Sequence, residues 1–179
     1  MPNSKLNWLL SALITLGSLL ICLLALPTRS PGMTLMGIGP NWLLIWLVAW
    51  SLNRPVVIAI AAGIALGFLQ DAMTLTDQIQ IVPTHAVGMA IAGGLTAILQ
   101  KQRYIQEDFI SVALIVFGMA VVVETSIAIQ LTLISRDIST IWMMQQRIAL
   151  SSAILSSLWS PVLHFPLSRW WRRLDSTEK

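Results

Sequence analysis

Long runs of apolar residues with almost no charge constrain this chain more than any other feature. The clearest run covers residues 40–71, PNWLLIWLVAWSLNRPVVIAIAAGIALGFLQD, in which Arg54 is the only charge before Asp71. Because a backbone in lipid must satisfy its own hydrogen bonds, runs like this one form helices. Pro55 cannot continue a helix, so residues 53–55 predict a turn. We therefore predict two apolar helices folded back to back, with the rest of the chain packed around this hairpin.

The two arms of this hairpin carry different faces. On the first arm, tryptophans recur every four residues, at Trp42, Trp46 and Trp50, and so line one bulky face of a helix. On the second arm, Gly63 and Gly67 have the four-residue spacing that lets another helix approach closely. The sequence leaves open whether that second helix belongs to this chain or to a partner.

Composition places the chain among integral membrane proteins. Hydrophobic residues make up 56% of it and charged residues only 11%, against roughly 25% charged residues in soluble domains. Its 179 residues allow several spans of ~20 residues but no sizeable aqueous domain. The basic residues lie beside apolar runs, which favours a role in membrane orientation over nucleic-acid binding. The single Cys22 excludes an internal disulfide, and we expect no cofactor.

The pattern predicts an all-α membrane protein, a six-transmembrane helix bundle that forms one domain over residues 1–179. The predicted spans are 6–26, 40–52, 56–70, 84–100, 109–133 and 148–167. Residues 135–146 are predicted as an amphipathic segment in the outer headgroup region. The second and third spans are short for a bilayer, so we expect neighbouring helices to shield them inside the bundle.

Basic residues predict the orientation of the bundle. An even number of spans places both termini on one side, and most of the 11 basic residues fall on that side. These are Lys5, Arg54, Lys101, Arg103, Arg169, Arg172, Arg173 and Lys179, against Arg29, Arg136 and Arg147 on the other. Since cytoplasmic loops are enriched in Lys and Arg, we expect a multi-pass membrane protein with both termini cytoplasmic.

Two carboxylates lie in or beside the predicted spans. Glu124 is deep in the fifth span, where an ionised carboxylate costs roughly 2.5–3.5 kcal/mol. It is therefore a neutral group hydrogen-bonded to a serine or threonine within the bundle, a contact to a partner helix, or a proton or cation site. Asp71 ends the third span near the outer interface. It is either a solvated helix end or a group that orients the following loop.

Patterns typical of catalysis are absent from the sequence. There is no GxSxG or HExxH motif, and we expect the serines at 152, 156 and 160 to act in helix packing. His85 and His164 have no carboxylate or second histidine three or four residues away, which argues against a metal site. We therefore predict no enzyme activity and no catalytic, cofactor-binding or metal-binding residues.

Several of these residues together resemble a known family. The stretch PNWLLI at 40–45, Trp50, Arg54 and GFLQD at 67–71 are similar to the core of the rod shape-determining protein MreD family. Chain length, six spans, a carboxylate in the fifth span and a basic tail are similar too. The chain departs from the family at 82–83, where Val-Pro stands in place of the usual Leu-Gly pair.

The resemblance implies a non-catalytic scaffold of the bacterial elongation machinery, or elongasome, located in the bacterial inner membrane. Such a protein binds MreC and, through it, helps to couple MreB to peptidoglycan synthesis by RodA and a class B penicillin-binding protein, and so to cell-shape control. The resemblance also implies a fold similar to the S component of energy-coupling-factor transporters. The alternative function is therefore a substrate-binding, S-component-like subunit of a vitamin transporter. That function needs a polar pocket, for which the candidates are Asn41, Asp71, Gln78, Gln80 and His85.

We expect partner binding and packing to rest on a small set of residues. They are Pro40, Asn41, Trp42, Gly63, Gly67, Asp71 and Glu124. The hypothesis is that the outer ends of the second and third spans dock a helix of the MreC-like partner, with close packing along Gly63 and Gly67. A proton-coupled carrier is a third possibility, and it requires Glu124 to titrate.

Overall fold

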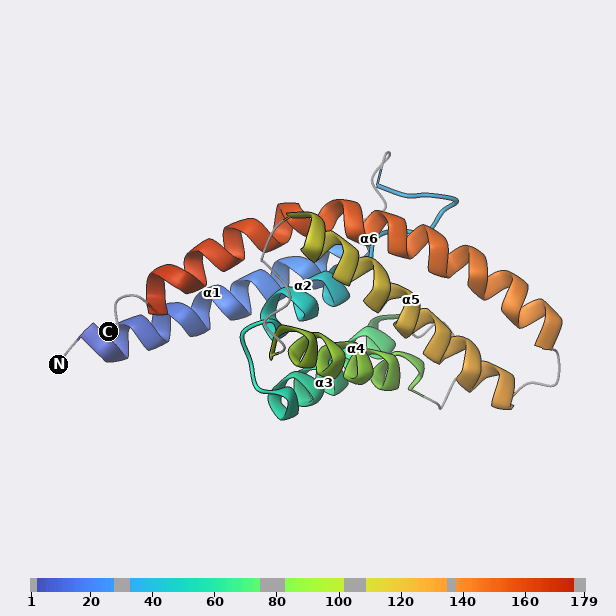
Figure 1. The fold of residues 1–179 in the computed structure, drawn as a ribbon, viewed down its shortest axis with the longest axis horizontal. Helices are drawn as coiled ribbons and strands as arrows, with labels where there is room; N and C mark the ends of the chain where they lie inside the picture. The colour runs from blue at the N-terminus through green and yellow to red at the C-terminus, as the bar shows by residue number, and fades with distance from the viewer. Residues whose placement is uncertain (1–2, 28–32, 75–82, 102–108, 135–137, 176–179) are drawn as a thin grey trace.

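The computed structural model of the chain describes residues 3–27, 33–74, 83–101, 109–134 and 138–175. These residues form helices and contain no strand, which confirms the predicted all-α fold class. The six helices are α1 (Asn3–Ala25), α2 (Trp42–Ser51), α3 (Val56–Thr74), α4 (Thr84–Lys101), α5 (Phe109–Ile134) and α6 (Ile138–Asp175) (Figure 1). The start of α1 and the end of α6 lie at the same end of the molecule (Figure 1).

Helix α2 is the centre of the bundle. It is 10 residues long, and residues 43–49 are buried. It contacts each of the other five helices, and α3 and α4 lie beside each other as a second pair (Figure 1). Because α2 is enclosed by protein, it does not need the length of a membrane span. The expectation that this short segment lies inside the bundle is therefore met.

Helix α3 does not meet the expectation that neighbouring helices shield it inside the bundle. It continues to Thr74, and one side of it is open, with Val57 78% and Phe68 53% exposed. An α-helix presents only part of its surface to a single neighbour, and α3 packs mainly against α4. Apolar residues therefore remain on its outer side. This side is suited to lipid or to another apolar partner.

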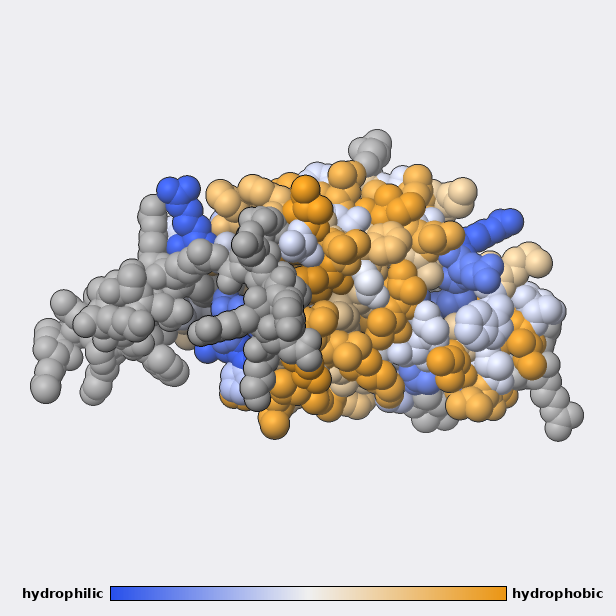
Figure 2. Space-filling view, in the orientation of Figure 1, coloured by the Kyte–Doolittle hydropathy of each residue, from blue (hydrophilic) through white to orange (hydrophobic). Residues whose placement is uncertain are grey.

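Three of the helices are long and apolar enough to cross a membrane, judged by length and composition over the described residues. They are α3, α5 and residues Ile138–Trp170 of α6. The shorter apolar helical stretches are Leu9–Ala25, Trp42–Ser51 and Thr84–Gln100. Figure 2 shows a broad hydrophobic surface with hydrophilic residues toward both ends of the long axis. This pattern fits a bilayer crossed roughly along that axis.

The predicted amphipathic segment 135–146 is not a separate element in the structure. From Ile138 on it forms the first turns of α6, and residues 135–137 lie outside the described residues. Residues 143–150, MMQQRIAL, are mostly good helix formers without glycine or proline, so nothing in the sequence ends the helix before the apolar part begins. The polar segment and the last predicted span are one continuous helix.

Two prolines, Pro161 and Pro166, lie inside α6. A proline has no N–H to donate, so the carbonyl of Ser157, four residues before Pro161, loses its usual helical partner. The hydroxyl of Ser160 donates to that carbonyl at 2.9 Å. A serine of the predicted stripe therefore satisfies a backbone group that proline leaves open, as an apolar environment requires.

Candidate functional site

The carboxylate of Asp71 joins the end of α3 to the start of α4. It accepts hydrogen bonds from the backbone N–H of His85, at 3.2 and 3.1 Å to its two oxygens, and from the hydroxyl of Thr84 at 3.2 Å. The Nδ1 atom of His85 lies 2.6 Å from Oδ1 of Asp71. Because an ionised carboxylate only accepts, such a contact places the imidazole proton on Nδ1.

This arrangement has a local cause in the sequence. The first N–H groups of a helix have no partner within it, and a side chain just before the helix usually accepts from one of them. The residue before α4 is Pro83, whose side chain carries no acceptor. Asp71 supplies the missing acceptor from another helix, and its negative charge suits the positive end of the helix dipole. The geometry thus favours an orienting role for Asp71 over a solvated helix end.

The second polar contact is deeper in the bundle and joins α5 to α6. Glu124 and Gln145 are 7% and 8% exposed. The side-chain amide of Gln145 donates to Oε2 of Glu124 at 2.6 Å and lies 3.4 Å from its backbone carbonyl. Of the three alternatives for Glu124, this geometry favours a hydrogen bond within the bundle. Its partner is Gln145 of α6, so the expected serine or threonine partner is wrong.

Two glutamines, Gln145 and Gln130, form hydrogen bonds between helices, and the sequence analysis predicted neither. Gln145 lies in the polar stretch before the last predicted span, where an amide has no distinguishing feature. Gln130 had a detectable signal, because it is an amide inside the apolar run of α5. Its side-chain amide donates to the backbone carbonyl of Thr84 at 3.0 Å and so joins α5 to α4.

The space beside Glu124 is small. A cavity of about 40 Å³ is lined by Glu124, Thr125, Ala128, Trp142, Gln145, Gln146 and Ala149. This volume accommodates about one water molecule, whereas pockets for small organic ligands measure roughly 300–1,000 Å³. Of the five polar-pocket candidates, Asp71 and His85 meet, and Gln78 and Gln80 lie outside the described residues. In the described part of the chain, no three His, Cys, Asp or Glu side chains form a group able to hold a metal ion.

The first turn of α2 is fixed to α6. Pro40 and Asn41 are both buried. The side chain of Asn41 accepts from the N–H of Leu44 at 3.1 Å and so caps α2, while its own N–H donates to the hydroxyl of Ser156 at 2.9 Å. The Pro-Asn pair of the resemblance therefore forms a helix start that is anchored on the serine stripe of α6.

The tryptophan face of α2 contacts three different parts of the molecule. Trp42 packs edge to face on Trp159 of α6, with ring centroids 5.6 Å apart, and the indole of Trp46 donates to the hydroxyl of Ser18 in α1 at 2.9 Å. Trp50 stacks on Trp46, and the guanidinium of Arg54 lies 5.3 Å from its ring centroid. The predicted bulky face is thus the surface that joins α2 to α1 and α6.

The glycine stripe of α3 lies against α4. A Cβ atom at Gly63 would stand 2.3 Å from the carbonyl oxygen of Met89, and one at Gly67 would stand 2.3 Å from Cα of Ala86. Both glycines are buried. Close packing along this stripe is therefore internal, and α4 occupies the face on which we had expected the partner helix. The partner contact along Gly63 and Gly67 is corrected accordingly.

Comparison with known proteins gives one match. A family model described as rod shape-determining protein MreD matches residues 3–173 of the 179-residue chain. No curated protein matches the chain, and no solved structure matches it.

Proposed function

The chain belongs to the MreD family of membrane proteins, and from that premise we propose that it is a non-catalytic scaffold of the bacterial elongation machinery. In this proposal it binds an MreC-like protein and, through that partner, helps to couple MreB to peptidoglycan synthesis by RodA and a class B penicillin-binding protein. The observation that carries the proposal is the family match, which extends over nearly the whole chain. Family membership supports the role in rod shape determination, and the partner contacts are our inference.

The use of the polar side chains supports a structural role. Hydrogen bonds join the helices in one spatial series, α1 to α2, α2 to α6, α6 to α5, α5 to α4 and α4 to α3. The pairs are Ser18 with Trp46, Asn41 with Ser156, Glu124 with Gln145, Gln130 with Thr84 and Asp71 with His85. In lipid, where apolar surfaces gain little by associating, such bonds and close packing hold helices together. The carboxylates of Asp71 and Glu124 thus help to hold the helices together, a role that requires no catalytic reaction.

For the partner helix we propose the open side of α3, in place of the glycine stripe. Val57, Ile64 and Phe68 are exposed and lie seven and four residues apart, so they form one apolar stripe on the open side of α3. This stripe leads toward Asp71 at the end of the helix. The proposed interface remains on the outer part of the third span, and its contact surface is the exposed side of α3 instead of the glycine stripe.

Co-purification tests this interface. Phe68→Ala is expected to lower recovery of the MreC-like partner, because it removes an aromatic side chain that is 53% exposed. The matched control is Ile129→Ala on α5, where the replaced side chain is 49% exposed. Equal recovery of the partner with both variants and with the unaltered protein contradicts the interface.

Depletion tests the function itself. In a rod-shaped host, loss of the protein is expected to give rounded cells, and Phe68→Ala is expected to rescue shape less well than Ile129→Ala. A host that stays rod-shaped after full depletion contradicts the scaffold role. In a naturally round host, recovery of the partner in a pull-down is the corresponding measurement.

We further propose that all six helices cross the bacterial inner membrane and that both termini are cytoplasmic. The position of the start of α1 and the end of α6 at one end of the molecule supports an even number of crossings (Figure 1). The basic residues near that end, such as Arg169, support the cytoplasmic side. Reporter fusions at the two termini should both be active in the cytoplasm, and activity of either one outside contradicts the orientation.

A further inference from the structure

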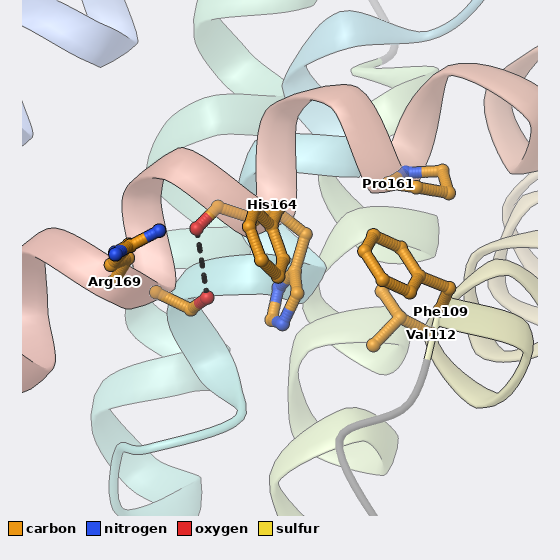
Figure 3. A pocket seen from close by; sticks show the side chains of 7 residues that line it. Phe109, Val112, Pro161, His164 and Arg169 are labelled. Atoms are coloured by element: carbon orange, nitrogen blue, oxygen red, sulfur yellow. Dashed lines mark hydrogen bonds between the residues drawn. The ribbon is translucent and has the colours of Figure 1, made fainter.

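A pocket lies between the start of α5 and the last third of α6, away from the contacts described above. It has a volume of about 280 Å³ and is lined by Phe109, Val112, Pro161, His164, Phe165, Ser168 and Arg169. Figure 3 shows the ring of His164 extending from α6 toward the side where Phe109 and Val112 of α5 lie. The pocket is partly open and combines one cation with one imidazole.

His164 is the unexplained polar group of this pocket. The residue is 6% exposed, and its Nδ1 atom is buried with no hydrogen-bond partner among the described residues. A buried polar atom without a partner costs free energy, so such atoms normally meet a protein group, a water or a ligand. The hydroxyl of Ser168 already donates to the carbonyl of Phe165 at 3.2 Å (Figure 3). His164 and the exposed Arg169 therefore remain as the donors available to an anion.

A second, apolar cavity adjoins this pocket. It has a volume of about 660 Å³ and runs between α5 and α6, lined by Phe109, Ile110, Ala113, Leu114, Phe117, Ile154, Ser157, Leu158 and Pro161. Phe109 and Pro161 line both cavities, so the polar pocket and the apolar groove are adjacent. The ring of Phe109 stacks on that of Phe165, with centroids 5.0 Å apart, and forms the wall at this junction.

The two cavities lie at the depth that a lipid requires. Phe109 is the first residue of α5, and Arg169 is followed by Trp170, an aromatic and basic pair typical of the membrane interface. The polar pocket is therefore at headgroup level, and the apolar groove continues from it along α5 toward Phe117 and the bilayer interior. Basic pockets between membrane helices on the cytoplasmic side are known to suit anionic headgroups.

We propose that these two cavities form a binding site for one anionic phospholipid. Its headgroup phosphate lies in the polar pocket against Arg169 and His164, and one acyl chain lies in the groove beside Ala113. Three features favour this occupant. They are charge complementarity with Arg169, the unpartnered nitrogen of His164 and the adjacency of a polar and an apolar cavity. The site makes no use of the partner surface on α3.

The experiment uses the full chain in nanodiscs that contain equal amounts of phosphatidylglycerol and phosphatidylcholine. Lipids retained after release from the disc are counted by native mass spectrometry. We expect selective retention of one phosphatidylglycerol molecule. Arg169→Gln should weaken it about fivefold, the equivalent of ~1 kcal/mol for one basic group near an anionic headgroup. The matched control Arg147→Gln, which replaces an exposed cation near the other end of α6, should change nothing.

A second variant tests the groove without changing charge. Ala113→Phe fills the apolar cavity and should reduce retention of phosphatidylglycerol, whereas Ala65→Phe, on the exposed side of α3, should not. Size-exclusion profiles show that each variant is folded before lipid is counted. Any one of three results overturns the proposal. The first is equal retention of both lipids, and the second is an equal effect of Arg147→Gln and Arg169→Gln. The third is displacement of the lipid by excess inorganic phosphate with no effect of Ala113→Phe.

Discussion

The contact between α3 and α4 yields the sharpest prediction, for the substitution Gly67→Ala. The added Cβ would lie 2.3 Å from Cα and 2.7 Å from the backbone nitrogen of Ala86, and 2.9 Å from the carbonyl carbon of His85. Carbon atoms in contact are normally ~3.5–4.0 Å apart, so one methyl group requires the two helices to separate by about 1 Å or more. All three neighbours are backbone atoms, so no side-chain rotation can relieve the overlap.

The expected cost follows from this geometry. Overpacking in a well-packed interior costs typically about 1–3 kcal/mol, and a clash with backbone belongs at the upper end of that range. For a chain of this size, a loss of that order lowers the midpoint of thermal unfolding by roughly 5–10 °C. The assay is thermal unfolding of the purified protein in detergent, with size-exclusion chromatography to detect helix rearrangement.

Gly118→Ala is the matched control for this prediction. Gly118 lies in α5, and a Cβ atom there meets nothing within 4 Å. Alanine is favoured over glycine in a helix by about 0.5–1 kcal/mol, so the midpoint should stay unchanged or rise slightly. If Gly67→Ala is as stable as Gly118→Ala, the α3–α4 packing described here is wrong. If both lose stability equally, glycine flexibility matters rather than close approach.

Substitutions at three further residues test the polar contacts. The effect of each is measured as a change in the free energy or the midpoint of unfolding. Asp71→Ala removes the acceptor for the N–H of His85 and should cost about 1 kcal/mol, with Asp71→Asn losing less; equal losses would show that capping of α4 is unimportant. Glu124→Leu leaves the buried amide of Gln145 unsatisfied and should cost about 1–3 kcal/mol, while leucine at both positions recovers most of it; additive losses contradict the pairing. Trp46→Phe removes the donor toward α1 and should cost about 0.6 kcal/mol together with faster proteolysis of α1, and an unaltered digestion rate contradicts that link.

Much of the architecture could be predicted because lipid imposes simple rules on sequence. Apolar runs broken by Pro55 and by polar loops marked the helices, and the four-residue spacing marked the tryptophan face and the glycine stripe. Spacing shows that Gly63 and Gly67 permit close approach, but it carries no information on which helix approaches. Only the three-dimensional arrangement shows that α4 takes that place and leaves the opposite face of α3 open.

The polar contacts were harder to predict for a physical reason. A buried group needs a partner of matching geometry, and the partner can come from any distance along the chain. Glu124 was conspicuous because a carboxylate in lipid is costly. Its partner Gln145 is 21 residues away, among other polar residues, where one more amide does not stand out. In the same way, Asp71 signalled the need for a partner, while the absence of an acceptor at Pro83 becomes meaningful only when α3 and α4 are known to be neighbours.

Approximate free energies allow the roles of packing and of hydrogen bonds in this bundle to be compared. Interhelical hydrogen bonds in membranes average about 0.6 kcal/mol each, so the series of bonds from α1 to α3 contributes only a few kcal/mol in total. That sum is close to the penalty expected from one methyl group at Gly67. The bundle is therefore as sensitive to one misplaced methyl group as to the loss of the whole series of bonds. The hydrogen bonds determine which helices are neighbours, because each polar group is satisfied in one arrangement. A bundle specified in this way presents the apolar stripe of Val57, Ile64 and Phe68 in a fixed position, as a protein that holds a partner helix requires.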